Sequence, residues 1–206
     1  MAITQRKRTQ VLEQAGQQGI GPSTSDLRKD SGRLRLYTYD DLPIWYKNNE
    51  NEFIRSGYRA ATGGAARCFE SWTYVHNETF NIYSHLLAAV SFLALLFVTE
   101  LLIEKRFPEA SLLDRAIFAF FLFTAVVALS VSSLYHTLTN HSPHVCMLWL
   151  NFDFAGIITL TFGGFISGIY VGFYCESKPR TIYWTMVSFC RLICIVAQDC
   201  VHRLPS

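Results

Sequence analysis

The C-terminal part of this 206-residue chain has very little charge. Asp, Glu, Lys and Arg make up only 17% of the whole chain, against about 25% in an ordinary soluble domain. Residues 1–82 hold 11 of the 18 Lys and Arg and 9 of the 16 Asp and Glu, and residues 116–138 contain none of the four. Such an uneven distribution excludes a single soluble globule and a low-complexity fibre.

Three other features are also missing. No CxxC pair occurs among the six cysteines, so we predict reduced, buried thiols instead of a disulfide framework. The net charge is only +2 and no basic stripe is interleaved with aromatic residues, which argues against nucleic acid as a partner. Residues 1–35 lack the apolar run of a signal peptide and have few large apolar side chains, which predicts a disordered tail.

The second half of the chain contains four long apolar runs. They cover residues 82–103, 116–138, 148–175 and 181–198. A helix needs about 20 mostly apolar residues to cross a bilayer. We therefore predict an all-α membrane protein with about four transmembrane helices, for which the lipid bilayer is the first partner.

The expected organisation follows from these runs. Four segments are predicted: a disordered cytoplasmic tail (1–35), a juxtamembrane cytoplasmic segment (36–81), a transmembrane domain (82–198) and a short tail (199–206). The Lys and Arg that precede the first run place the N-terminus in the cytoplasm. In that orientation the sequons at Asn77 and Asn140 stay unmodified. Gly164, Gly168 and Gly172 are predicted to form a smooth stripe for a neighbouring helix.

Three groups of polar residues stand at the ends of the apolar runs. Glu78, Asn81 and His85 are spaced for one helix face, and Ser132 and His136 share another. Asp153 follows, one turn into the third run. Ionisable groups in a membrane span are costly and often functional. We weigh two readings: polar caps and a bundle histidine that are simply hydrogen-bonded, or a metal site in which His136 binds the cation and Asp153 orients a water.

The order and spacing of these residues resemble a known family. Glu78-x2-Asn81-x3-His85, Ser132-x3-His136 and the later Asp153 are similar to the motifs of the progestin and adipoQ receptor family. This family belongs to the wider haemolysin III superfamily. The preceding Gly57-Tyr58-Arg59 also looks like the eukaryotic branch.

The resemblance implies a seven-helix bundle with a buried zinc ion near the cytoplasmic leaflet. It makes His136 a direct zinc ligand, Asp153 the residue that contacts the zinc-bound water, and Ser132 the motif serine. It implies a multi-pass receptor of the plasma membrane or an internal membrane, with a role in lipid or zinc homeostasis. The alternative that it implies is a zinc-dependent lipid amide hydrolase of the ceramidase type, with Asp153 and Ser132 as catalytic residues.

The family completes its zinc site with an H-x3-H pair on the last helix, and these 206 residues contain no such pair. We therefore expect a C-terminally truncated member with about four of the seven helices, so a third alternative is an inactive fragment. Candidate partners are a lipid or protein ligand, a second copy of the chain, or a full-length relative.

Overall fold

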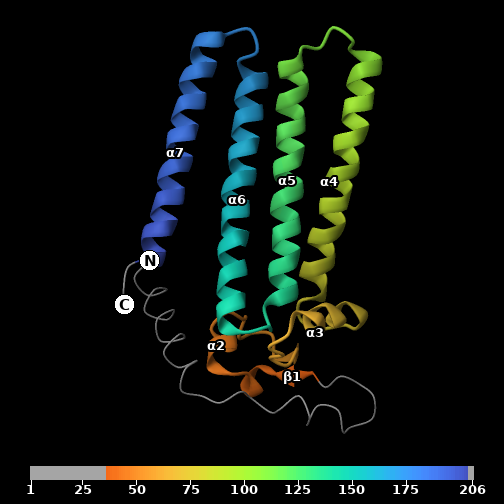
Figure 1. Cartoon of the computed structure of the whole chain (residues 1–206), viewed down its shortest axis with the longest axis vertical. Helices are drawn as coiled ribbons and strands as arrows, with labels where there is room; N and C mark the ends of the chain where they lie inside the picture. Colours follow the sequence, from red (N-terminus) through yellow and green to blue (C-terminus); the bar gives the residue numbers. More distant parts are fainter. Residues whose placement is uncertain (1–35, 204–206) are drawn as a thin grey trace. The chain divides into compact units, whose positions relative to one another are not determined.

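The computed structural model describes residues 36–203, which divide into two compact units. The first unit contains residues 36–83 and 134–150, and the second contains residues 84–133 and 151–203. The predicted tail over residues 1–35 and residues 204–206 lie outside the described residues. The elements, most of them labelled in Figure 1, are β1 (Tyr37–Thr38), η2 (Tyr39–Asp41), α2 (Ile44–Lys47), β2 (Ser56–Tyr58), α3 (Ala65–Glu70), η3 (Ser71–Thr73), α4 (Thr79–Arg106), α5 (Leu112–Leu138), α6 (Pro143–Gly172) and α7 (Ser177–Arg203).

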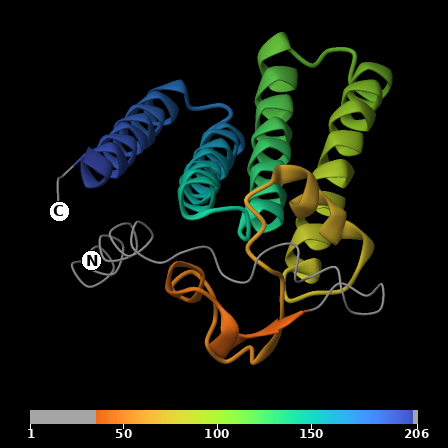
Figure 2. The ribbon, with the colours of Figure 1, turned by 60° about the horizontal axis from the view of Figure 1, so that its bottom comes forward.

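The first unit is built from short elements around an aromatic core. Figure 2 brings these elements forward, with β1 and α2 in orange and α3 in gold. The strands β1 and β2 pair antiparallel, with Tyr37 opposite Tyr58. Tyr46 and Tyr58 are fully buried and pack edge to face beside Leu42. Aromatic pairs of this geometry add to the stability that burial provides, so a segment with little regular structure still has a core.

Gly57 shapes the connection between this core and the start of α4. Its φ of +93° lies in a region that side chains rarely adopt. Its carbonyl accepts a hydrogen bond of 2.9 Å from the backbone N–H of Asn77. The sharp turn at Gly57 therefore brings the neighbouring Tyr58 and Arg59 into the interior of the unit, where both are buried.

The second unit consists of long apolar helices. In the described part of the chain, four helices are long and apolar enough to cross a membrane: α4, α5, α6 and α7 up to Ala197. At 1.5 Å per residue, a helix of 27 residues is about 40 Å long, which exceeds the ~30 Å hydrocarbon core of a bilayer. The predicted fold, an all-α multi-pass membrane protein with about four spans, is confirmed.

Consecutive helices of the second unit lie side by side, as Figure 1 shows. The contact between α5 and α6 is closest at two glycines. A Cβ at Gly156 would stand 3.2 Å from Ala128 Cα, and one at Gly163 would collide with the Thr124 hydroxyl. The predicted stripe is packed less closely, because a Cβ at Gly164 would stand 4.0 Å from Phe121 Cε2, and one at Gly168 or Gly172 would meet no atom of another described element within 4 Å. Close packing therefore depends on glycines other than those of the stripe.

The cysteines of the described residues are all unpaired, as predicted. Cys68 and Cys146 are buried, whereas Cys175, Cys190 and Cys194 are exposed. The prediction of buried thiols is therefore wrong for these three. Cys190 and Cys194 lie on α7, within the stretch that is long and apolar enough to cross a membrane.

Candidate functional site

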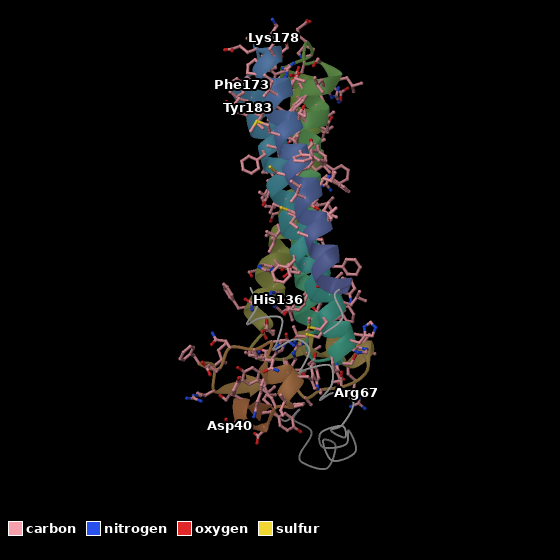
Figure 3. The ribbon with its side chains drawn as sticks, turned by 90° about the vertical axis from the view of Figure 1, so that its left-hand side faces the viewer. Asp40, Arg67, His136, Phe173, Lys178 and Tyr183 are labelled. Atoms are coloured by element: carbon pink, nitrogen blue, oxygen red, sulfur yellow. The ribbon has the colours of Figure 1, made fainter. Side chains whose placement is uncertain are left out.

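The candidate site lies in the first unit, where the end of α5 meets the residues before α4. His136 stands in the last turn of α5 and is labelled in Figure 3. Its Nδ1 lies 2.7 Å from Oε2 of Glu78, which is buried immediately before α4. An ionised carboxylate can only accept hydrogen bonds, so the ring donates from Nδ1. Two residues separated by 58 positions in the sequence thus form a partly buried imidazole–carboxylate pair.

Two asparagines hold the Glu78 carboxylate from other sides. Asn81 Nδ2 donates to Oε2 at 2.8 Å, and Asn77 Nδ2 donates to Oε1 at 3.1 Å. Burial alone raises the pKa of the Glu78 carboxyl. The hydrogen bonds from His136 and Asn81, together with the positive charge of Arg59, outweigh burial and lower this pKa. The group is therefore ionised when it accepts these bonds.

A second carboxyl lies beside Glu78. Asn77 Nδ2 also donates to Glu50 Oε2 at 3.0 Å, so one amide nitrogen joins the two acidic side chains. Burial, together with the negative charge of Glu78, raises the pKa of Glu50 to about 8. Burial and the charge of Arg59 lower the pKa of the adjacent His76 to about 4. Near neutral pH both groups are uncharged, and Glu78 carries the negative charge of the cluster.

Arg59 also fixes the end of α5. Its guanidinium is 1% exposed and donates to the backbone oxygens of His136, at 2.7 Å, and Thr137, at 2.9 Å. It also donates to the hydroxyls of Ser71 and Thr139. The last carbonyls of a helix lack partners within the helix, so this contact both caps α5 and holds the backbone of His136.

The residues predicted to act together belong to different units. His136, Glu78 and Asn81 lie in the first unit, whereas Ser132 and Asp153 lie in the second, on α5 and α6. Ser132 is buried and Asp153 is half-buried. The roles assigned to Ser132 and Asp153 stay predictions.

Sequence reasoning missed two groups of this site. Arg59 was visible only as part of Gly57-Tyr58-Arg59, and nothing in that motif says that the guanidinium is buried. Glu50 stands in a polar stretch, Asn48-Asn49-Glu50-Asn51-Glu52, that looks like a solvated loop. The Glu78 motif was the one signal that pointed toward the acidic cluster.

The donor set fits one ligand position of a zinc site. Metal-binding histidines usually donate their second ring N–H to a carboxylate, which is the arrangement of Glu78 and His136. The residues that the structure describes contain no group of three or more His, Cys, Asp or Glu able to hold a metal ion. Zinc sites use at least three protein ligands, so His136 would need further ligands from outside this set.

Comparison with known proteins adds independent information. Residues 73–203 match the family described as haemolysin-III related. The chain is 37% identical over 168 residues to the progestin and adipoQ receptor-like protein 1 of Caenorhabditis elegans, covering 81% of this chain and 37% of that protein. It is 35% identical over 162 residues to the adiponectin receptor protein of Drosophila melanogaster, covering 78% of this chain and 35% of that protein.

A fungal protein matches over a longer stretch. The ADIPOR-like receptor IZH1 of Eremothecium gossypii is 30% identical over 193 residues, which cover 92% of this chain and 59% of that protein. The chain thus spans less than two thirds of the length of each of these relatives.

Proposed function

Because the chain belongs to the haemolysin-III-related family, we propose that it acts as a zinc-holding membrane receptor of the adiponectin and progestin type, in lipid or zinc homeostasis. The observation that carries this proposal is the contact of His136 with Glu78 at 2.7 Å. With hydrogen on Nδ1, the ring presents its lone pair at Nε2, the form of histidine that binds metals. The names of the relatives support the receptor class.

Some residues of the chain would bind the metal, and others would orient its ligands. His136 holds the metal, and Glu78 orients the ring and compensates part of the positive charge. Asp153 keeps the role that the family resemblance implies, contact with a metal-bound water, and Ser132 keeps that of the motif serine. Zinc, when bound, would supply positive charge and would polarise a bound water. In a receptor, the charge of the metal would stabilise the helices that hold it. The N-terminal segment of the chain would lie in the cytoplasm.

Metal content of the purified full chain tests the proposal. We expect near-stoichiometric zinc by elemental analysis in detergent, and loss of zinc in His136→Ala. His144→Ala is the matched control, because His144 is exposed near the start of α6. Wild-type protein without zinc, or His136→Ala protein that keeps it, would contradict the zinc site. Turnover of a lipid amide by the zinc-loaded chain would replace the receptor with the hydrolase alternative.

A further inference from the structure

We propose that Glu78 is a positioning residue that holds His136 in a single ring tautomer, with the hydrogen on Nδ1 and the lone pair on Nε2. The inference deepens the proposed function and rests on it only for the identity of the ion that Nε2 binds. A neutral imidazole in water exchanges between two tautomers, and only one of them presents Nε2 as a ligand atom. A fixed tautomer therefore decides in advance which ring nitrogen is available.

The contact between the two side chains has the geometry that this role needs. The Nδ1 to Oε2 distance of 2.7 Å is short for an N–H···O bond and typical of one that involves an ionised partner. The side chains of His136 and Glu78 are only 18% and 10% exposed. Because so little water reaches this bond, little competes with Glu78 for the Nδ1 hydrogen.

Both partners are held in place independently of each other. Arg59 Nη2 and the Thr139 hydroxyl donate to the backbone oxygen of His136, at 2.7 and 3.2 Å. Asn81 and Asn77 donate to the Glu78 carboxylate. The His136 ring is thus held between a fixed backbone and a fixed hydrogen-bond acceptor. A carboxylate that only balanced charge would not need its two oxygens to be oriented in this way.

The side chain at position 78 selects the tautomer of His136, because a carboxylate can only accept a hydrogen bond and an amide can also donate one. A glutamate accepts from Nδ1–H and from nothing else on the ring. A glutamine has nearly the same shape, but its amide can either accept from Nδ1–H or donate to a bare Nδ1. Glu78→Gln therefore removes the choice of tautomer while it retains the volume of the side chain.

The test is nitrogen NMR of the full chain with ¹⁵N-labelled histidine, in detergent at mildly alkaline pH, with the His136 signals assigned by their absence in His136→Ala. We expect a protonated Nδ1 and a bare Nε2 in the wild type, and a mixture of both tautomers in Glu78→Gln. Glu78→Asp keeps a carboxylate and should partly restore the wild-type pattern. Glu70→Gln is the matched control, because it makes the same chemical change in a carboxyl that is exposed on α3 of the same unit. Thermal melting checks that each variant is folded.

A second readout is the affinity for zinc. Loss of the residue that orients a metal ligand costs about 10–100-fold in metal affinity, so we expect that loss in Glu78→Gln and none in Glu70→Gln. An unchanged His136 tautomer in folded Glu78→Gln protein overturns the inference, even where the wild type binds zinc. Wild-type protein that binds no zinc contradicts the proposed function, and the tautomer measurement still decides the inference.

Discussion

Arg59 shows how much one side chain can organise at the residue scale. The C-terminal end of a helix carries partial negative charge, and its last carbonyls need donors. Arg59 supplies donors from a segment 77 positions earlier in the sequence, and its hydrogen bonds end on His136 and Thr137. A planar guanidinium can satisfy several acceptors at once, which an ammonium cannot. The arginine therefore sets the position of the histidine without touching its ring.

The raised pKa of Glu50 predicts how the stability of the first unit depends on pH. Its pKa of about 8 in the folded chain lies above the ordinary value of 4.5. Between these values the unfolded chain has released the proton that the folded chain keeps, so stability falls as pH rises. His76 has the opposite effect, because its folded pKa of about 4 lies below 6.5, and it acts only below pH 6.5. The effect of His76 fades as the pH rises above 6.5, so Glu50 carries most of the expected fall in stability between pH 6.5 and 8.

We expect the thermal midpoint of the detergent-purified chain to fall as pH is raised from 6.5 to 8, and to fall clearly less in Glu50→Gln. Glu70→Gln serves as the control, because Glu70 is exposed on α3 of the same unit. The measurement is a series of thermal melts over this range. An equal decline in wild type and Glu50→Gln would assign the effect to another group.

The residues of the site were only partly predictable. His136 and Glu78 could be named because each lies in a motif with regular spacing at the end of an apolar run. Their contact could not be derived, because helix periodicity relates residues three or four positions apart and says nothing about a partner 58 positions away. Moreover, Glu78 precedes the first residue of α4, Thr79, so the predicted helix face over Glu78, Asn81 and His85 begins one residue too early.

At the scale of the elements, apolar runs predicted the helices but not their ends. The run over 148–175 became α6, which begins earlier, at Pro143, and ends at Gly172. Proline is favoured in the first turn of a helix because its missing N–H would lack a partner there anyway. Hydropathy reports which segments are apolar enough for the membrane, whereas the ends of a helix depend on local residues such as Pro143. The pairing of β1 and β2 carried no hydrophobic signal, because each strand has only two or three residues.

Glycine spacing was also a poor guide to helix contacts, and this leads to a prediction. Gly163→Ala places a methyl group against the hydroxyl of Thr124, a residue that is 1% exposed. Gly168→Ala places the same group where no described atom lies within 4 Å. Overpacking costs about 1–3 kcal/mol, whereas alanine in an open helical position gains up to about 1 kcal/mol over glycine. We expect Gly163→Ala to lower the thermal midpoint and Gly168→Ala to leave it unchanged or raise it.

Thermal melts of both variants in the same detergent provide the comparison, and the double variant Thr124→Ser with Gly163→Ala supplies a check. Thr124→Ser removes the Thr124 methyl group, which would stand 3.0 Å from a Cβ at Gly163. Part of the lost thermal midpoint should therefore be recovered. Equal midpoints for the two single variants would mean that α5 and α6 do not approach each other closely at Gly163.

At the scale of the whole molecule, the number of spans was predictable, whereas the division into units was not. Four runs of sufficient length correspond to four helices that can span a membrane. The division separates residues that are neighbours on one helix, such as Ser133 and Leu134 of α5. No composition change marks this point, because it depends on which distant segments pack against the last turn of α5.

Orientation in the membrane is the remaining whole-molecule prediction. The sequons offer a weak test, because Asn140 is 1% exposed and its Nδ2 donates to Ala60 O. A glycan there is incompatible with the folded first unit on either side of the membrane. Cys175 offers a stronger test. It is exposed and lies between the end of α6 and the start of α7, so a cytoplasmic N-terminus places it on the opposite side.

In sealed microsomes, whose outer surface is cytoplasmic, we expect a membrane-impermeant maleimide to label Cys175 only after the membrane is opened. A protease added outside should remove an N-terminal tag without that step. Cys175→Ser identifies the signal, because any labelling that persists in this variant comes from another thiol. Cys190 and Cys194 lie within the span of α7, where a water-soluble reagent has little access. Labelling of Cys175 in closed microsomes, together with a protected tag, would reverse the orientation and place the Glu78–His136 pair at the other face of the bilayer.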